Sequence, residues 1–173
     1  MKEKLLVVVD MQKDFIDGAL GTKEAQGILP AVRERISLAR GRGERIVFTR
    51  DTHEQNYLST QEGKLLPVVH CVRGTDGWQL AEGLCAAGER IFDKPAFGSP
   101  ELAAYVREEG FSQVELIGVC TDICVISNAI LIKSFCPETQ VSVRADCCAG
   151  ATPRGHETAL SAMAVCQVNI LRG

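Results

Sequence analysis

Short hydrophobic runs and longer amphipathic stretches alternate along this chain. Runs such as KLLVVV and VELIGV are continuously apolar, which is typical of strands buried on both faces of a parallel sheet. Strands are predicted over 4–9, 45–49, 89–93, 114–119, 141–145 and 167–171. We therefore expect a sheet of about six strands.

Helical periodicity occupies most of the intervals between these runs. The clearest helix has Ser99 as its N-cap, Pro100 at its first helical position and Gly110 just past its end. Helices are predicted over about 28–41, 100–109, 120–135 and 155–165. Residues 17–27 and 50–77 are predicted to be polar loops.

The alternation of strand and helix predicts an α/β protein with three layers, α/β/α, around an open, mostly parallel, Rossmann-like sheet. A length of 173 residues fits one domain, and we expect residues 1–173 to form it. In such folds the active crevice lies beyond the carboxyl ends of the strands. Residues that directly follow strands are therefore the first candidates for chemistry.

Charge and cysteine content restrict the class of partner. The formal charge is -3, and the lysines and arginines form neither a basic stripe for nucleic acid nor a polybasic membrane patch. The first apolar run is too short for a signal peptide or a membrane span. We expect a cytoplasmic protein that acts on a small molecule, with most of its eight cysteines present as free thiols.

Three residues near predicted strand ends could form a nucleophilic site. A helix N-terminus and a nearby ammonium such as Lys94 would stabilise a Cys124 thiolate. Asp10 could act as general base and general acid. Each residue also has a plainer role, because an aspartate can cap a helix, a lysine can be a surface charge, and most cysteines are inert core residues. Residue types alone therefore do not choose Cys124.

The segment DTHEQNYLSTQEGKLLPVVHC predicts a divalent metal site. It contains two of the three histidines of the chain, His53 and His70, together with the acids Asp51 and Glu62. Imidazole and carboxylate ligands suit zinc, iron or manganese. The candidate ligands are Asp51, His53, Glu62 and His70. Neither a C-x-x-C redox pair nor a G-x-G-x-x-G or P-loop motif is present, so a dithiol or nucleotide role is not favoured.

Four segments, in order, resemble the cysteine hydrolase superfamily of nicotinamidases, isochorismatases and N-carbamoyl amidases. They are LLVVVDMQKDF, FDKPAFGSPEL, LIGVCTDICVISNA and ADCCAGATPRGHETAL. The resemblance implies an isochorismatase-like hydrolase fold over nearly the whole chain. It also implies that Asp10, Lys94 and Cys124 are the catalytic triad, that the N–H groups of Cys120 and Cys124 form an oxyanion hole, and that the Val119–Cys120 peptide bond is cis.

Within the superfamily, the metal segment resembles that of nicotinamidases. This implies hydrolysis of nicotinamide to nicotinate and ammonia, with zinc the first expected metal and iron or manganese the alternatives. The pocket residues implied are Phe15, Leu66 and Val119. Family members are commonly dimers or tetramers, so a homo-oligomer is expected.

Other functions remain open at this stage. Some nicotinamidases carry a tryptophan where this chain has Pro67, which leaves other small amides as possible substrates. The rivals are a metal-independent N-carbamoyl amidase or isochorismatase-like hydrolase, a binding protein on the same fold, and a thiol-redox or metal-storage protein.

Overall fold

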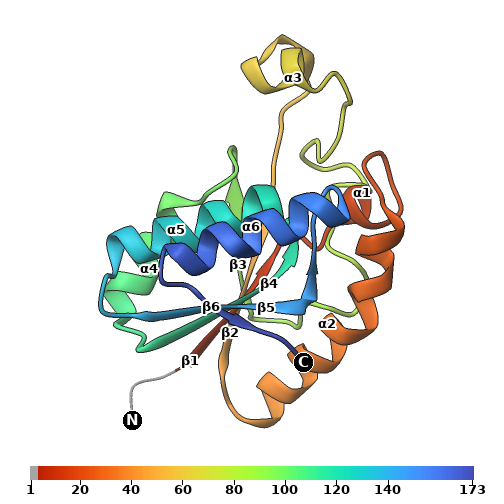
Figure 1. The fold of residues 1–173 in the computed structure, drawn as a ribbon. Coiled ribbons are helices and arrows are strands. Elements are labelled where there is room, and N and C mark those ends of the chain that lie inside the picture. The colour runs from red at the N-terminus through yellow and green to blue at the C-terminus, as the bar shows by residue number, and fades with distance from the viewer. Residues whose placement is uncertain (1–3) are drawn as a thin grey trace.

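The computed structural model describes residues 4–173, and six strands in this range form one parallel sheet with the order β3-β2-β1-β4-β5-β6 (Figure 1). Every neighbouring pair of these strands is parallel. The strands are β1 (Lys4–Val9), β2 (Arg45–Asp51), β3 (Arg90–Lys94), β4 (Gln113–Val119), β5 (Gln140–Ala149) and β6 (Asn169–Leu171). The predicted parallel sheet is confirmed. Because the strands are parallel, their carboxyl ends lie at the same edge of the sheet.

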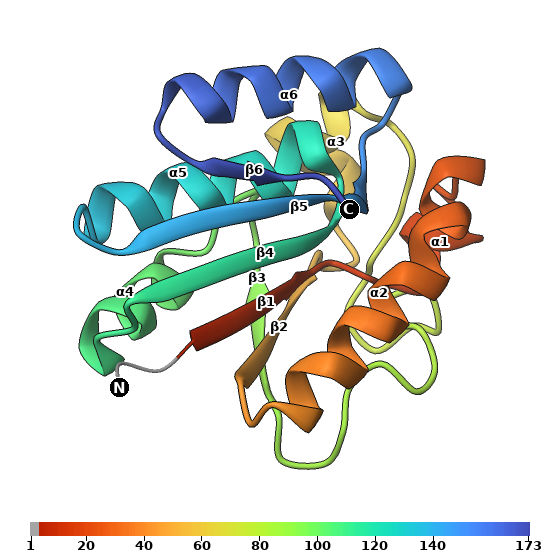
Figure 2. The ribbon, with the colours of Figure 1, turned by 60° about the horizontal axis from the view of Figure 1, so that its bottom comes forward.

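Helices cover both faces of this sheet. Figure 2 shows α2 on one side and α4, α5 and α6 on the other, which confirms the predicted three layers. The long helices are α2 (Lys23–Gly41), α4 (Pro100–Glu109), α5 (Ile126–Phe135) and α6 (Pro153–Val165). The short elements are α1 (Lys13–Ile16), the 3-10 turn Tyr57–Ser59, α3 (Gln61–Leu65) and the π-helical turn Thr121–Val125.

Each face of the sheet has its own apolar core. On one face, Leu5, Val7 and Val9 pack with residues of α4, α5 and α6. On the other face, Leu6 and Val8 pack with residues of α2. Successive side chains of β1 thus point into opposite cores, which explains why its sequence is apolar throughout.

Several segments differ from the predicted pattern. The predicted loop 50–77 contains a 3-10 turn and α3, and β5 continues to Ala149, beyond its predicted end at residue 145. The structure begins α2 at Lys23, inside the stretch expected to be a loop, because Thr22 caps the helix by accepting from the Ala25 N–H at 3.0 Å. Pro30 lies inside this helix, although proline normally marks a helix end. The helix predicted from Cys120 instead opens with the π-helical turn, and α5 begins at Ile126.

The closest approach between β1 and β4 occurs at a glycine. Gly118 has a φ of 115°, and a Cβ atom at this position would collide with the carbonyl oxygen of Val9. Only glycine fits here, because the backbones meet directly and the conformation is left-handed. The close approach brings the end of β4, and the turn that follows it, next to Asp10.

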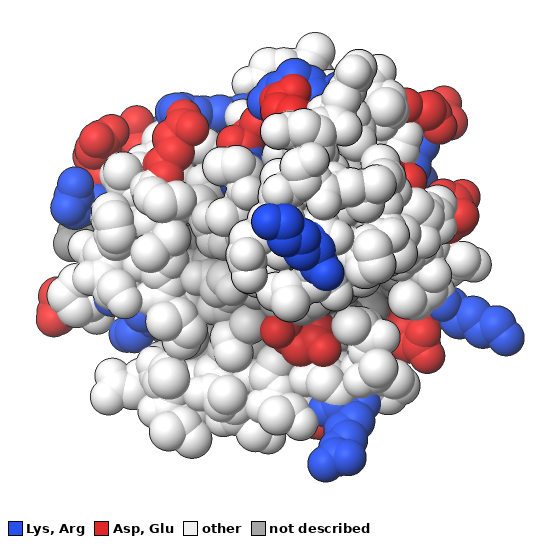
Figure 3. All heavy atoms as spheres, turned by 90° about the horizontal axis from the view of Figure 1, so that it is seen from above, with Lys and Arg blue, Asp and Glu red and all other residues white. Residues whose placement is uncertain are grey.

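The segment that contains α3 projects beyond the carboxyl edge of the sheet (Figure 1). It carries exposed apolar side chains, namely Leu58, Leu65, Leu66 and Val69. Figure 3 looks onto this edge and shows a surface on which uncharged residues predominate.

No helix among residues 4–173 has both the length and the apolar character needed to cross a membrane. All eight cysteines are free thiols, as expected.

Candidate active site

The strand order places three predicted residues at the carboxyl ends of β1, β3 and β4, which lie within four neighbouring strands. Asp10 follows β1 with a positive φ of 48°, and its carboxylate accepts a hydrogen bond of 2.6 Å from the Thr49 hydroxyl of β2. Lys94 is the last residue of β3. Cys124 lies in the π-helical turn after β4. Because parallel strands end at the same edge, side chains far apart in sequence meet there.

These three side chains are in contact. The Lys94 ammonium lies 2.6 Å from Asp10 Oδ2 and 3.3 Å from Cys124 Sγ. The exposed fractions of Asp10, Lys94 and Cys124 are 0%, 1% and 4%, so the charges are held away from bulk water. A third contact of the ammonium, at 3.1 Å, is with the carbonyl oxygen of Ala96.

Burial dominates the protonation of this site. It raises the pKa of Asp10 above the ordinary carboxyl value, although the nearby Lys94 charge acts in the opposite direction. Burial and the neighbouring Asp10 charge raise the pKa of the Cys124 thiol well above its usual range. Burial alone would lower the pKa of Lys94, but the charges of Asp10 and Cys124 raise it. Burial therefore opposes the Cys124 thiolate that the Lys94 charge favours, and the thiol lies beside a carboxyl group that can take its proton.

The turn that carries Cys124 is held in place by an asparagine. Asn128 donates a hydrogen bond of 2.8 Å to the Cys124 carbonyl oxygen and accepts one of 2.9 Å from the Ser99 N–H. The turn begins after a cis peptide bond between Val119 and Cys120, as the family resemblance implied. Burial raises the pKa of the Cys120 thiol to about 12, so this thiol stays protonated.

The four predicted metal ligands converge next to these residues. Their candidate ligand atoms all lie within 4.8 Å of one another; the residues are Asp51, His53, Glu62 and His70. Asp51 Oδ2 is 2.9 Å from His53 Nε2 and 3.5 Å from His70 Nε2. Tetrahedral ligands about 2.1 Å from an ion lie about 3.4 Å apart, so this cluster fits a zinc-sized cation.

Hydrogen bonds around the cluster orient its ligands. His70 Nδ1 lies 2.7 Å from the Val68 carbonyl oxygen, a contact in which the ring donates and leaves Nε2 facing the cluster. Asp51 Oδ1 lies 3.5 Å from the Lys94 ammonium. The two oxygens of Asp51 thus face two centres, the candidate metal site and Lys94.

Sequence reasoning missed the anchors that hold these elements together. The Gln12 side chain accepts from the Asp51 N–H at 2.7 Å and donates to the Asp51 carbonyl at 2.9 Å, which ties the end of β1 to the end of β2. Asp14 accepts from the Cys71 N–H at 2.8 Å, next to His70. The sequence signal that could have identified these anchors is a polar residue shortly after a buried strand, such as Gln12 after the apolar run 4–9.

Aromatic rings border the metal cluster. The Tyr57 ring lies 4.6 Å from the His53 ring and 5.0 Å from the His70 ring, and sequence reasoning did not identify it. Phe15 lies 5.6 Å from the His70 ring. The Leu66 carbonyl accepts from the Tyr57 hydroxyl at 2.9 Å, while Val119 is buried immediately before the turn.

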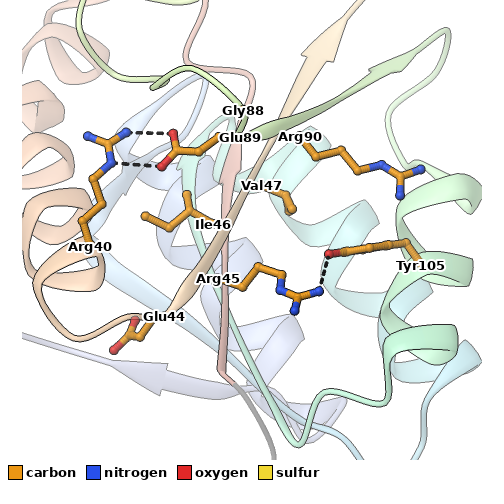
Figure 4. Close-up of a pocket in the computed structure, with 9 residues that line it drawn as sticks. All are labelled: Arg40, Glu44, Arg45, Ile46, Val47, Gly88, Glu89, Arg90 and Tyr105. Atoms are coloured by element: carbon orange, nitrogen blue, oxygen red, sulfur yellow. Dashed lines mark hydrogen bonds and ion pairs between the residues drawn. The ribbon is translucent and has the colours of Figure 1, made fainter.

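A pocket of about 450 Å³ lies at the start of β2 and β3, at the opposite edge of the sheet (Figure 4). Its charged side chains are paired within the protein. Arg40 binds Glu89 at 2.8 Å, and Arg45 contacts the Tyr105 hydroxyl at 3.4 Å. None of the predicted catalytic or metal-ligating residues lines this pocket.

A thiol, a carboxylate and an ammonium in contact, beside a candidate metal centre, are the groups of a hydrolase with a cysteine nucleophile. Residues 4–172 match the isochorismatase domain, and the chain belongs to the isochorismatase family. Its likeness to amidases of this family makes it a hydrolase acting on amides.

Three relatives illustrate the range of similarity. A pyrazinamidase of Pyrococcus horikoshii, solved in complex with zinc, is 32% identical with a TM-score of 0.87, and the match covers 99% of each chain. A nicotinamidase of Saccharomyces cerevisiae is 27% identical over 73% of this chain and 80% of its own. A probable inactive nicotinamidase of Arabidopsis thaliana is 30% identical over 87% of this chain and 83% of its own.

Proposed function

We propose that this chain is a metal-dependent nicotinamidase, which hydrolyses nicotinamide to nicotinate and ammonia. The observation that carries the proposal is the direct contact of Asp10, Lys94 and Cys124 beside a cluster of four metal-binding side chains. The thiol would then face the carboxamide of a substrate molecule, and the metal site would face the ring nitrogen of the same molecule.

The raised pKa values of Cys124 and Asp10 support a mechanism in which one proton moves between them. The Cys124 thiol transfers its proton to Asp10 as the sulfur attacks the amide carbon. The N–H groups of Cys120 and Cys124 hold the oxyanion. Asp10 returns the proton to the leaving ammonia and later takes one from the water that hydrolyses the thioester. Throughout these steps, the Lys94 ammonium holds the Asp10 carboxylate and the Cys124 sulfur next to each other.

The donor set fits a divalent cation, with zinc first and iron or manganese as alternatives. The ligands would be Asp51, His53, Glu62 and His70, and a bound ion would supply a coordination position for the ring nitrogen of the substrate. Phe15, which lies against the His70 ring, would line one side of the substrate ring. Leu66 and Val119 would complete the pocket.

The proposal extends to the state of the protein in the cell. Residues 1–173 act as one domain, the protein is cytoplasmic, and it forms a dimer or tetramer. The exposed apolar side chains of the α3 segment are consistent with an assembly. Light scattering on the eluting protein gives the mass of the assembly directly.

The test is ammonia release from nicotinamide by the purified protein, as prepared, after chelation, and after separate addition of zinc, iron or manganese. Release that is lost on chelation and restored by one metal is the expected result. Cys124→Ala should abolish release while retaining bound metal, and Asp51→Ala should weaken both metal and substrate binding. Turnover by Cys124→Ala would exclude this nucleophile.

One feature favours a second candidate function, hydrolysis of another small amide, for which a metal-independent reaction is the alternative within the family. Pro67 occupies the position where some nicotinamidases carry a tryptophan. Hydrolysis of an N-carbamoyl amide that persists after chelation would support this alternative, whereas metal-dependent release from nicotinamide alone would exclude it.

A further inference from the structure

The N-terminus of α6 contacts the turn that carries Cys124. Thr121, the first residue of this turn, is fully buried, and its hydroxyl lies 2.8 Å from His156 Nδ1. His156 belongs to the first turn of α6, and its N–H donates to the carbonyl oxygen of the N-cap Thr152 at 2.9 Å. The histidine is thus fixed by the helix and in turn holds the Thr121 side chain.

A second pair of contacts joins the same two elements. Asp122 accepts a hydrogen bond of 2.9 Å from the Ala151 N–H, just before α6. A Cβ atom at Gly155 would meet Asp122 Oδ2, so a side chain at this point of the helix would displace the Asp122 carboxylate. Two consecutive residues of the turn are therefore bound to the start of α6.

These contacts lie between Cys120 and Cys124, whose N–H groups are the oxyanion donors of the proposed mechanism. Asn128 holds the opposite side of the turn through the Cys124 carbonyl oxygen. The carbonyl oxygen of Cys120 accepts hydrogen bonds from the N–H groups of Ile123 and Val125 within the turn. Among the hydrogen bonds described, the one with His156 is the side-chain contact that fixes Thr121 from outside the turn.

We propose that His156 is a positioning residue for hydrolysis: by fixing Thr121, the residue that follows Cys120, it holds in place the turn between the two oxyanion donors, the N–H groups of Cys120 and Cys124. This inference rests on the proposed function, because it assigns His156 a role in that reaction. Loss of one oxyanion donor costs about 100- to 1000-fold in kcat, and misalignment of a donor costs less. Removal of His156 should therefore lower kcat by about 10- to 100-fold.

The test compares amide hydrolysis with alkylation of Cys124 by iodoacetamide. Alkylation displaces iodide from carbon and forms no oxyanion, so it reports an intact thiol independently of the oxyanion donors. All variants are made with Cys166→Ser, because Cys166 is the exposed cysteine and would also react. The variants are His156→Ala, His156→Asn, whose amide can place a polar atom near the position of Nδ1, and the control Ser161→Ala on the exposed side of α6.

His156→Ala is expected to lower kcat about 10- to 100-fold with KM, alkylation rate and melting temperature nearly unchanged. His156→Asn should recover most of kcat, and Ser161→Ala should match the parent. An unchanged kcat in His156→Ala overturns the proposal. A parallel fall of kcat and alkylation rate also overturns it, because that pattern reports general loss of the site.

Failure of the proposed function gives a different result. If the parent releases no ammonia from nicotinamide, hydrolysis of p-nitrophenyl acetate replaces the amide reaction, since this ester also passes through an oxyanion at Cys124. The same ratio between parent and His156→Ala is expected. Equal rates, or a parent that reacts with neither substrate, overturn the role of His156.

Discussion

Removal of the Lys94 ammonium is the most informative perturbation of this protein, because the charge is completely buried. Lys94→Met leaves the fully buried Asp10 carboxylate without the partner that lies 2.6 Å from it. Breaking a buried ion pair by removing one partner typically costs about 3–5 kcal/mol. The variant should lose a comparable part of its free energy of unfolding at pH 7.

Protonation of Asp10 sets an upper limit to this loss. A carboxyl group with an unfolded pKa of about 3.9 costs about 4 kcal/mol to protonate at pH 7, at about 1.4 kcal/mol per pH unit. Without Lys94 the folded pKa of Asp10 rises further above the unfolded value. A carboxyl group with a raised folded pKa destabilises the fold as pH rises towards that pKa, so the loss should shrink by up to about 1.4 kcal/mol per unit between pH 7 and pH 4.

The assay is urea denaturation of the chelated protein at several pH values, so that metal binding does not contribute. Adding Asp10→Asn to Lys94→Met removes the stranded charge and should recover most of the stability. The control Lys133→Met alters a partly exposed lysine whose ammonium lies at the surface, and it should change stability by less than about 0.5 kcal/mol. A double variant no more stable than Lys94→Met, or a loss independent of pH, would refute the reasoning.

Two further predictions concern stability away from these side chains. Gly118→Ala should cost about 3 kcal/mol in denaturation experiments, because its φ of 115° and the adjacent Val9 carbonyl exclude a side chain. Gly27→Ala, which meets open space inside α2, should instead stabilise the fold by about 0.5–1 kcal/mol, because alanine is the better helix former. Glu115→Gln should cost about 2 kcal/mol at pH 7, since Glu115 accepts hydrogen bonds from Arg35 and Arg144. These partners outweigh burial and lower the pKa of Glu115, so its contribution is present above the unfolded pKa of about 4.3 and is lost on acidification. A gap between parent and Glu115→Gln that persists at pH 3 would contradict this.

The parallel sheet could be predicted because its strands are buried on both faces and end at polar residues. The run at 4–9, for example, is apolar throughout and stops at Asp10. The same logic brought Asp10, Lys94 and Asp51 to one edge, and the structure places them together. Local sequence is sufficient in these cases, because parallel topology fixes where strand ends meet.

The remaining differences come from tertiary context. The helix α2 continues through Pro30 because the flanking turns pack against the sheet, which no local propensity reveals. The π-helical turn at Thr121–Val125 is held by the nearby Asn128 and also by His156 of α6, which is 35 residues away from Thr121 in the sequence. The raised pKa of Cys124 also escaped prediction, because proximity to Lys94 was inferred from sequence whereas the depth of burial was not.

The division of Asp51 between two centres limits how this chain can change by mutation. One oxygen faces the histidines and the other faces Lys94, so any replacement of Asp51 removes a candidate ligand and a counter-charge in a single step. Glu62 joins the cluster through a contact of 3.7 Å with His53, from the projecting segment. A single substitution of Glu62 therefore alters only the ligand set, whereas a substitution of Asp51 requires a compensating change near Lys94.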